Sequence, residues 1–149
     1  MSTHTDLTVR KTVSVNCSPE QAFELFTNGL ASWWPFETHS PSQKAPEVVV
    51  FEPRVGGRVY DRLAEGEERD WATVTAWEPP SRLAVDWHVS AGAPRTQLEV
   101  TFTPANGGTR VDLTHAGWER YGTEAAESFE DYNGGWDTVL GRYVAKANS

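Results

Sequence analysis

The middle of this 149-residue chain consists of six strand-length segments separated by short turns. These segments are residues 48–51, 58–63, 69–77, 83–89, 96–103 and 109–115. Most of them alternate apolar and polar side chains, which is typical of a strand with one buried face. The turns between them contain Gly or Pro and are too short for the crossover that parallel strands require. The segments are therefore expected to pair as an antiparallel sheet.

Two local features of this sheet differ in how clearly the sequence predicts them. Asn106-Gly107-Gly108 is the strongest hairpin signal in the chain, because Asn and Gly tolerate the positive φ angles of a tight turn. Over residues 71–77, by contrast, the odd-numbered and the even-numbered side chains are both apolar enough to face the core. Either face of this strand could therefore be the inner one.

Helical segments flank the sheet in the sequence. An alternating strand over 7–16 is followed by residues 18–21 (Ser-Pro-Glu-Gln), whose Ser cap, early Pro and Gln are typical of a helix start. One further helical turn is expected over 30–34. From 123 to 146, apolar and aromatic residues recur every three or four positions, which predicts a long amphipathic helix.

Together these elements predict an α+β fold, with a curved antiparallel sheet of about seven strands, two short helices and a long C-terminal helix. Only the last helix is long enough to cover the apolar face of such a sheet. A curved sheet around one helix rarely fills the space between them, so an internal cavity is expected. A single domain is predicted over residues 1–149, with its core at about 7–146, and a chain of this length buries about two-thirds of its surface.

Seven tryptophans occur in a chain of which only 38% is hydrophobic. Each adds a large apolar area and one N–H group that needs a hydrogen-bond partner when it is buried. The rings could fill a core that is poor in Leu and Ile. They could equally line a cavity, since small-molecule sites are mostly apolar and aromatic. The sequence leaves both interpretations open for each ring.

The charge and cysteine content exclude several classes of function. A net charge of −8 repels phosphate backbones and anionic lipid, so neither a nucleic acid nor a membrane is expected as a partner. No export signal and no apolar run of membrane-spanning length is visible. The single cysteine, Cys17, excludes an internal disulfide and fits a cytoplasmic location. Metal-ligand spacing and phosphate-binding or dinucleotide-binding motifs are lacking, so no metal and no cofactor is expected.

Eight short motifs follow one another along the chain. They are Ser18-Pro19-Glu20-Gln21-Ala22-Phe23, Trp33-Trp34-Pro35, Phe51-Glu52-Pro53, Gly56-Gly57-Arg58, Trp77-Glu78-Pro79-Pro80-Ser81-Arg82-Leu83, Gly108-Thr109-Arg110-Val111, Thr114-His115-Ala116-Gly117-Trp118 and Gly135-Trp136-Asp137. In this order, from about 9 to 144, the chain resembles the START-like helix-grip superfamily, also called SRPBCC or Bet v 1-like. Within it, the motifs resemble the bacterial branch related to the C-terminal domain of the heat-shock-protein-90 ATPase activator.

The resemblance implies a helix-grip fold that holds a small apolar or aromatic molecule in its cavity, without demonstrable catalysis. It also implies an alternative, a co-chaperone-like protein-binding module with a chaperone or another protein as partner, because the family namesake stimulates a chaperone ATPase. Both a monomer and a homodimer are compatible with the family. Ala72 replaces a frequent Gly of the family and Asp61 a frequent Glu, and these departures bear on the shape of the pocket beside them.

Strand alternation and the expected cavity select nine candidate ligand-binding residues. They are Trp34, Val59, Asp61, Trp71, Trp87, His115, Phe129, Tyr132 and Trp136. Trp34 and Trp71 are expected near the entrance of the cavity and the others inside it. No catalytic residue is assigned.

Asp61 and His115 are the titratable residues expected to face the cavity. As a pair they could serve as base and orienting acid in a cyclase or hydrolase, or they could fix a polar group of the ligand. In the structural alternative, which we favour, His115 bonds to a backbone carbonyl and Asp61 pairs with Arg58, Arg62 or Arg110. The catalytic alternative requires Asp61 and His115 to come within hydrogen-bond reach of each other.

Overall fold

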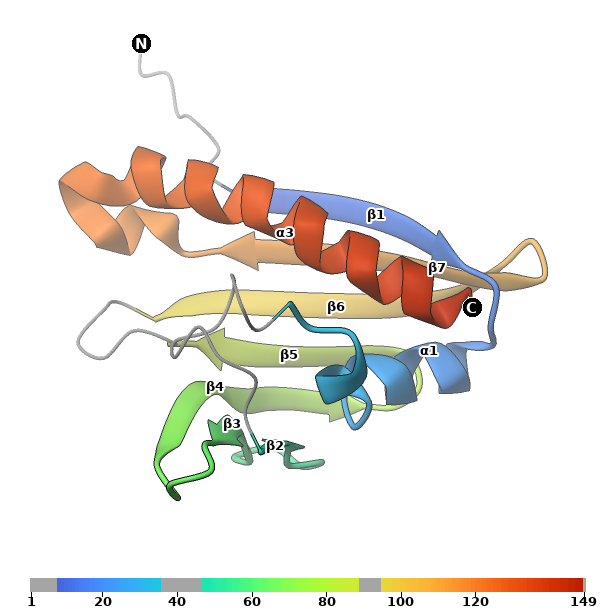
Figure 1. Cartoon of the computed structure of the whole chain (residues 1–149). Coiled ribbons are helices and arrows are strands. Elements are labelled where there is room, and N and C mark those ends of the chain that lie inside the picture. The colour runs from blue at the N-terminus through green and yellow to red at the C-terminus, as the bar shows by residue number, and fades with distance from the viewer. Residues whose placement is uncertain (1–7, 36–46, 89–94, 149) are drawn as a thin grey trace, which may run out of the picture.

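Seven strands form one sheet in the computed structural model, which describes residues 8–35, 47–88 and 95–148. The strands are β1 (Val9–Val15), β2 (Val48–Phe51), β3 (Arg58–Arg62), β4 (Glu68–Glu78), β5 (Arg82–Trp87), β6 (Thr96–Ala105) and β7 (Gly108–Ala116). Their order is β1-β7-β6-β5-β4-β3-β2, so the first strand lies beside the last (Figure 1). Every pair is antiparallel, which confirms the prediction.

Four helical segments accompany the sheet in the described residues. They are α1 (Pro19–Phe26), the 3-10 turns η1 (Leu30–Ser32) and η2 (Trp118–Glu124), and α3 (Ala125–Ala147). The start of α1 has the predicted capping box, in which Ser18 and Gln21 each accept the other's backbone N–H at 3.2 Å. The long helix begins at Ala125 and not at Thr123, because residues 118–124 form the 3-10 segment η2, which the sequence did not predict and which is kinked at Gly122, with φ 61° and ψ −123°. In the described ranges, no helix is long and apolar enough to cross a membrane.

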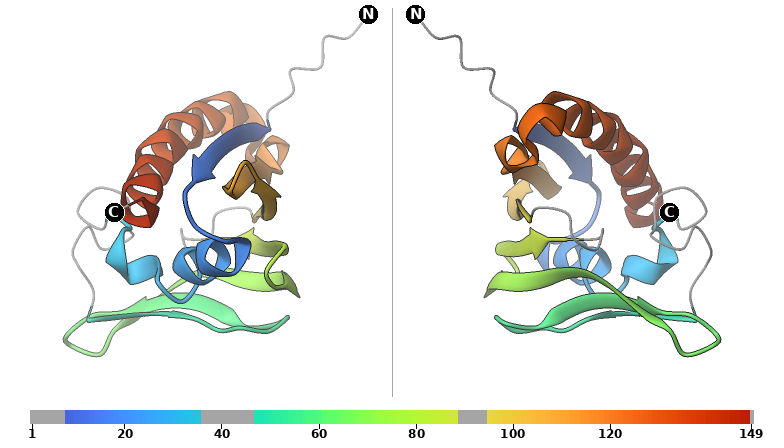
Figure 2. Two further views of the ribbon diagram at one scale, coloured as in Figure 1. Left: turned by 90° about the vertical axis from the view of Figure 1, so that its right-hand side faces the viewer. Right: turned by 90° about the vertical axis from the view of Figure 1, so that its left-hand side faces the viewer.

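The helices lie on the concave face of the curved sheet (Figure 2). α3 packs beside β1 and η2, and α1 packs against β6, β7 and α3. The two helices are joined by the buried Tyr143 hydroxyl of α3, which donates to the Ala22 carbonyl oxygen of α1 at 2.8 Å. This arrangement is the α+β helix-grip fold that the sequence predicted.

The buried face of β4 changes along the strand, which is why simple alternation did not assign it. The register with the neighbouring strands shifts twice and leaves Trp71 as an extra residue opposite β3 and Thr75 as an extra residue opposite β5. Each such bulge reverses the alternation of side chains. Trp71 and Val74 are consequently both buried. Further along, Trp77 contacts Phe23 of α1, with 5.0 Å between the ring centroids.

Gly134 lies within α3 without a contact that requires a glycine. The residue is exposed, and a Cβ atom added to it would meet nothing within 4 Å. Glycine inside a helix costs about 1 kcal/mol relative to alanine. We therefore expect Gly134→Ala to raise the free energy of unfolding by about 0.5–1 kcal/mol in a denaturant titration.

Gly108→Ala is the matched control for this prediction. Its Cβ atom would clash with the Val15 carbonyl oxygen, which belongs to the neighbouring strand β1. The same substitution should therefore destabilise the protein at Gly108 and stabilise it at Gly134. A Gly134→Ala variant that is less stable than the wild type would contradict the assignment of this position to an open helix face.

Candidate functional site

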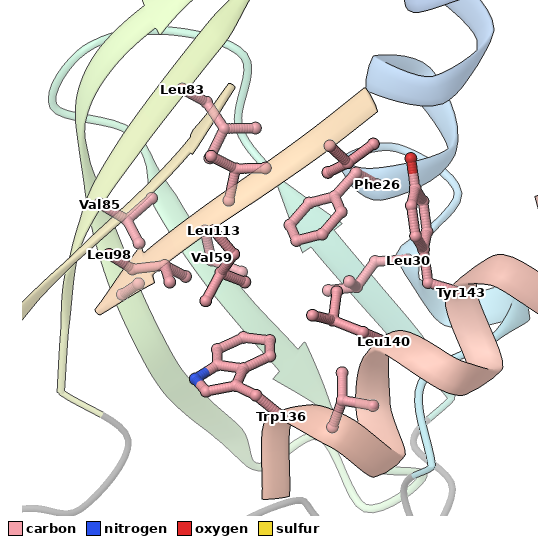
Figure 3. Close-up of a cluster of buried hydrophobic side chains, with 14 of the residues drawn as sticks. Phe26, Leu30, Val59, Leu83, Val85, Leu98, Leu113, Trp136, Leu140 and Tyr143 are labelled. Atoms are coloured by element: carbon pink, nitrogen blue, oxygen red, sulfur yellow. The ribbon is translucent and has the colours of Figure 1, made fainter. Parts of the chain in front are cut away.

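A cavity lies between the concave face of the sheet and the helical segments. Its wall consists entirely of apolar and aromatic residues, namely Phe26, Leu30, Trp34, Phe51, Val59, Trp71, Ala72, Leu83, Val85, Trp87, Leu98 and Trp136. Figure 3 shows Val59 and Leu98 of the sheet opposite Trp136 of α3. The free space inside this wall is well below the size of a typical small-molecule site. The space is narrow, with room for about one water molecule while the rings stay in place.

Four of the wall residues are tryptophans that pack on one another. These residues, Trp34, Trp71, Trp87 and Trp136, form the tryptophan cluster. The ring centroid of Trp34 lies 4.9 Å from that of Trp71, 6.2 Å from that of Trp87 and 6.0 Å from that of Trp136. All four residues are at most 8% exposed, and Trp71, which was expected near the entrance, is 1% exposed. The rings therefore fill the core and line the cavity at the same time.

Three indole N–H groups of the cluster bond to residues behind the wall. Trp71 donates to Asp61 Oδ2 at 3.2 Å, Trp87 to the Tyr132 hydroxyl at 3.2 Å, and Trp136 to His115 Nδ1 at 3.0 Å. The three acceptors were predicted inside the cavity, but none of them belongs to its wall. Phe129, predicted there too, is half-buried and packs against the core. Because a buried indole N–H needs an acceptor, the polar candidates hold the rings that form the wall.

His115 has both ring nitrogens engaged and is fully buried. An indole N–H can only donate, so Nδ1 accepts from Trp136 and carries no proton. The neutral ring then carries its proton on Nε2, which donates to Thr96 Oγ1 at 2.6 Å. Burial lowers the pKa of His115 to about 3. Both ring nitrogens thus take part in hydrogen bonds within the core, and their partners are two side chains and not the backbone carbonyl that we expected.

Asp61 is a buried carboxylate with one unpaired oxygen. Alternation predicted that it points inward on β3, and it is 0% exposed. Oδ2 accepts the Trp71 N–H, whereas Oδ1 has no hydrogen-bond partner among the residues that the structure describes. Burial raises the pKa of Asp61, while the Trp71 hydrogen bond and the charge of Arg69 oppose that rise. Leaving a carboxylate oxygen buried and unpaired is costly, so this atom is the polar feature of the site that the fold itself does not explain.

The arginines that were expected to pair with Asp61 bond to other carboxylates. Arg58 pairs with Glu68 at 3.1 Å, Arg62 with Glu68 at 3.5 Å, and Arg110 with Asp112 at 2.9 Å. The side chains of all three arginines are 41–58% exposed. The prediction of an ion pair for Asp61 is therefore wrong, because these side chains extend into solvent and Asp61 points into the core.

Asp61, His115 and Cys17, the three candidate groups for acid–base or nucleophilic chemistry, are not hydrogen-bonded to one another through their side chains. The hydrogen bonds of Asp61 and His115 go to different partners, and no hydrogen bond joins the two residues. The Cys17 thiol is half-buried, and burial raises its pKa, the opposite of what a nucleophilic thiolate requires. Within the described part of the chain, no group of three His, Cys, Asp or Glu side chains could hold a metal ion.

Several wall residues were not identified as site residues from the sequence. Alternation had placed Leu83, Val85 and Leu98 on inward faces, and it also places Thr96, the partner of His115, on the face of Leu98. The contributions of α1 and η1, through Phe26 and Leu30, depend on how these segments sit against the sheet. The alternation pattern of the strands does not predict how these two segments pack against the sheet.

Comparisons with known proteins give one family and several similar structures. The family model for Activator of Hsp90 ATPase homolog 1-like protein matches residues 16–145. No curated protein matches the chain significantly.

Three solved structures illustrate the range of similar proteins. The anthrahydroquino-γ-pyrone synthase Txn09, solved as a complex, is 38% identical, with 80% of this chain and 82% of that chain covered and a TM-score of 0.59. The self-sacrificing resistance protein CalC from Micromonospora echinospora is 26% identical over 94% of this chain and 93% of that one, with a TM-score of 0.73. Aha1 from Colwellia psychrerythraea, solved as a dimer, is 18% identical, with 95% of this chain and 96% of that chain covered and a TM-score of 0.68. At this identity, the similarity shows only that the two proteins share a fold.

Proposed function

This chain belongs to the family of Activator of Hsp90 ATPase homolog 1-like proteins, and we propose that it binds a small aromatic molecule in the cavity lined by the tryptophan cluster. The observation that carries the proposal is the cavity wall, which is wholly apolar and includes four indole rings. Such a wall favours flat apolar molecules, because aromatic faces stack and exclude water. The similarity to Txn09, a synthase of an anthrahydroquino-γ-pyrone, supports an aromatic ligand by analogy.

A ligand of this kind requires one ring of the wall to move, because the free space is narrow. Trp34 is the ring that we expect to move. It follows the single 3-10 turn η1, whereas Trp71 and Trp87 are held in strands and Trp136 in the long helix. The ligand would then pack against the other three rings of the tryptophan cluster in the place of the Trp34 ring. These three rings would therefore lose little apolar contact.

A second candidate function is an enzyme that acts on such a molecule. Txn09 is a synthase, and Asp61 provides a buried carboxylate oxygen that could accept a proton from a bound molecule. His115 could not assist, since both of its nitrogens are engaged. Catalysis of this type predicts that Asp61→Asn lowers turnover at least about a hundredfold while ligand binding survives.

A protein-binding module receives less support from the arrangement of the tryptophans. A docking surface made of these rings would expose them in one patch. Instead, Val55 is the exposed large hydrophobic residue in the part of the chain that the structure describes. The co-chaperone-like alternative would therefore need a surface of a different kind.

Naphthalene is a suitable probe for the proposed function. We expect it to quench tryptophan emission and to raise the melting temperature of the wild-type protein, because it would contact the tryptophan cluster and bind only the folded state. Val85→Phe places a larger side chain in the cavity and should weaken binding about tenfold or more.

Val111→Phe is the matched control for this experiment. Val111 is as buried as Val85, at 1% against 2% exposure, but it lies outside the cavity wall. Both variants overpack the core, so both should lose stability, by about 1–3 kcal/mol. Only Val85→Phe should lose affinity for naphthalene. Absence of binding to the wild type, or equal losses in both variants, would contradict the proposal.

A further inference from the structure

We infer that the cavity selects aromatic molecules that carry a hydrogen-bond donor, such as a phenolic hydroxyl, and that Asp61 Oδ1 accepts this bond. The inference rests on the proposed function, since it requires the molecule to occupy the cavity. It goes further by naming the chemical class of the ligand and the atom that recognises it.

Asp61 lies immediately behind one side of the cavity wall. Val59, two residues earlier on the same face of β3, is a wall residue, and so is Trp71, which donates to the other oxygen of the same carboxylate. Trp71 is at once the ring that a ligand would contact and the ring that Asp61 holds. Because Asp61 itself does not line the cavity, a polar group of the ligand reaches this carboxylate only where the Val59 and Trp71 side chains give way to it.

The cation beside Asp61 does not occupy its free oxygen. Arg69, which is opposite Asp61 in the pairing of β3 and β4, bonds to Glu67 at 2.9 Å. Burial raises the pKa of Asp61, and the charge of Arg69 opposes that rise without supplying a proton to Oδ1. An ionised carboxylate accepts hydrogen bonds only, and such charge-assisted bonds are about twice as strong as neutral ones. The site is therefore built to receive a donor.

The same wall has little to offer to an acceptor on the ligand. The N–H groups of Trp71, Trp87 and Trp136 already donate to residues behind the wall. A ligand carbonyl or ether oxygen buried beside these rings would lose its hydrogen bonds to water without gaining others from them. We therefore expect the cavity to discriminate between a hydroxyl group and its methyl ether, although the two have the same ring.

Three probes with one ring system isolate this property. They are 2-naphthol, which has a donor, 2-methoxynaphthalene, which keeps the oxygen without the donor, and naphthalene, which has neither. We expect the wild-type protein at neutral pH to bind 2-naphthol about tenfold more tightly than either of the others, by calorimetry or tryptophan quenching.

Two substitutions of Asp61 should change the preference among these probes in different ways. In Asp61→Asn, the Trp71 N–H can bond only to the amide oxygen, so the amide NH₂ group replaces the free carboxylate oxygen as a donor. The preference should then reverse in favour of 2-methoxynaphthalene. In Asp61→Leu, which has a similar shape but no polar atom, the three probes should bind within about threefold of one another.

Asp112→Asn is the control, because it makes the same chemical change far from Asp61. Asp112 is a partly exposed carboxylate in β7, which lies next to the edge strand β1, whereas Asp61 is in β3, near the other edge of the sheet. This variant should keep the wild-type preference for 2-naphthol. The melting temperature of each variant shows whether it is folded, and the wild-type series decides the question even if one variant is not.

The outcomes separate the inference from the proposed function on which it rests. If none of the three probes binds the wild type, the proposed function fails and the inference with it. If the wild type binds all three equally, the cavity binds aromatic molecules but the inference about a donor is overturned. Tighter wild-type binding of 2-methoxynaphthalene than of 2-naphthol would also overturn it, since Asp61 would then donate a proton and not accept one.

Discussion

Trp136→Ala is expected to lower the free energy of unfolding by about 3–5 kcal/mol, as measured by denaturant titration. The residue is 3% exposed, and its ring lies 6.0 Å from Trp34 and 5.8 Å from Trp87 between centroids. Truncation would enlarge the existing cavity, which the surrounding strands cannot close. It would also leave His115 Nδ1 buried without its donor.

Trp136→Phe separates the loss of the hydrogen bond from the loss of the ring. Phenylalanine keeps most of the apolar contact but has no N–H group, so we expect a cost of about 1–3 kcal/mol. If that cost arises at His115, Trp136→Phe should cost less in a His115→Phe background, where no acceptor is left unpaired. Thr138→Ala, at an exposed position of the same helix, should change stability by no more than about 0.5 kcal/mol. A similarly small effect of Trp136→Ala would show that the ring is not buried.

Most of the sheet was predictable because the signals that define it are local. Alternation with a period of two assigns an inner face within a single segment, and so it placed Asp61 between Val59 and Leu63 correctly. The tight turn between β6 and β7 was equally local, since Asn106 and Gly107 have the positive φ angles, 51° and 81°, that their residue types predict. β4 was the exception, because its two bulges arise from pairing with strands on both sides.

The roles of the polar site residues were less predictable, because their partners are distant in the sequence. His115 bonds to Trp136, which is 21 residues away, and Trp87 bonds to Tyr132, which is 45 residues away. One general signal was nevertheless present. Each buried indole requires an acceptor, so a chain with seven tryptophans must reserve buried acceptors for several of them. If the inward-facing polar residues had been assigned as acceptors for the indole N–H groups, they would have been predicted to lie behind the tryptophan rings and not in the cavity.

His115 should make the protein lose stability as the pH falls below about 6.5. Burial lowers its pKa from 6.5 to about 3 in the folded protein, whereas in the unfolded chain the ring takes up a proton near its ordinary pKa. Between these two values the unfolded state binds more protons than the folded state, so unfolding is favoured increasingly as the pH falls. The resulting loss in the free energy of unfolding is absent above about pH 6.5 and reaches about 4–5 kcal/mol near pH 3.

Asp61 has the opposite effect on stability over the pH range in which its own carboxyl group titrates. Its pKa is raised by burial, so the folded protein takes up this proton at a higher pH than the unfolded chain does. The penalty for burying the charge is present at high pH and is relieved as the pH falls through the raised pKa. The pH dependence of the wild type is therefore the sum of a loss at His115 and a gain at Asp61, and single variants are needed to separate them.

His115→Gln isolates the contribution of His115. A glutamine can accept from the Trp136 N–H through its amide oxygen and donate to Thr96 through its amide NH₂ group, but it does not titrate. The variant can be less stable overall, but its stability should fall less steeply than that of the wild type between about pH 6.5 and pH 4, because glutamine takes up no proton. The carboxylates that titrate in this range are common to both proteins, so they do not contribute to the difference. Nitrogen chemical shifts of the His115 ring in the wild type provide an independent measurement and should report a neutral imidazole, protonated on Nε2, down to about pH 4. Parallel stability curves for the two proteins, or a ring that becomes charged near pH 6.5 while the protein stays folded, would show that His115 is not held neutral by Trp136 and Thr96.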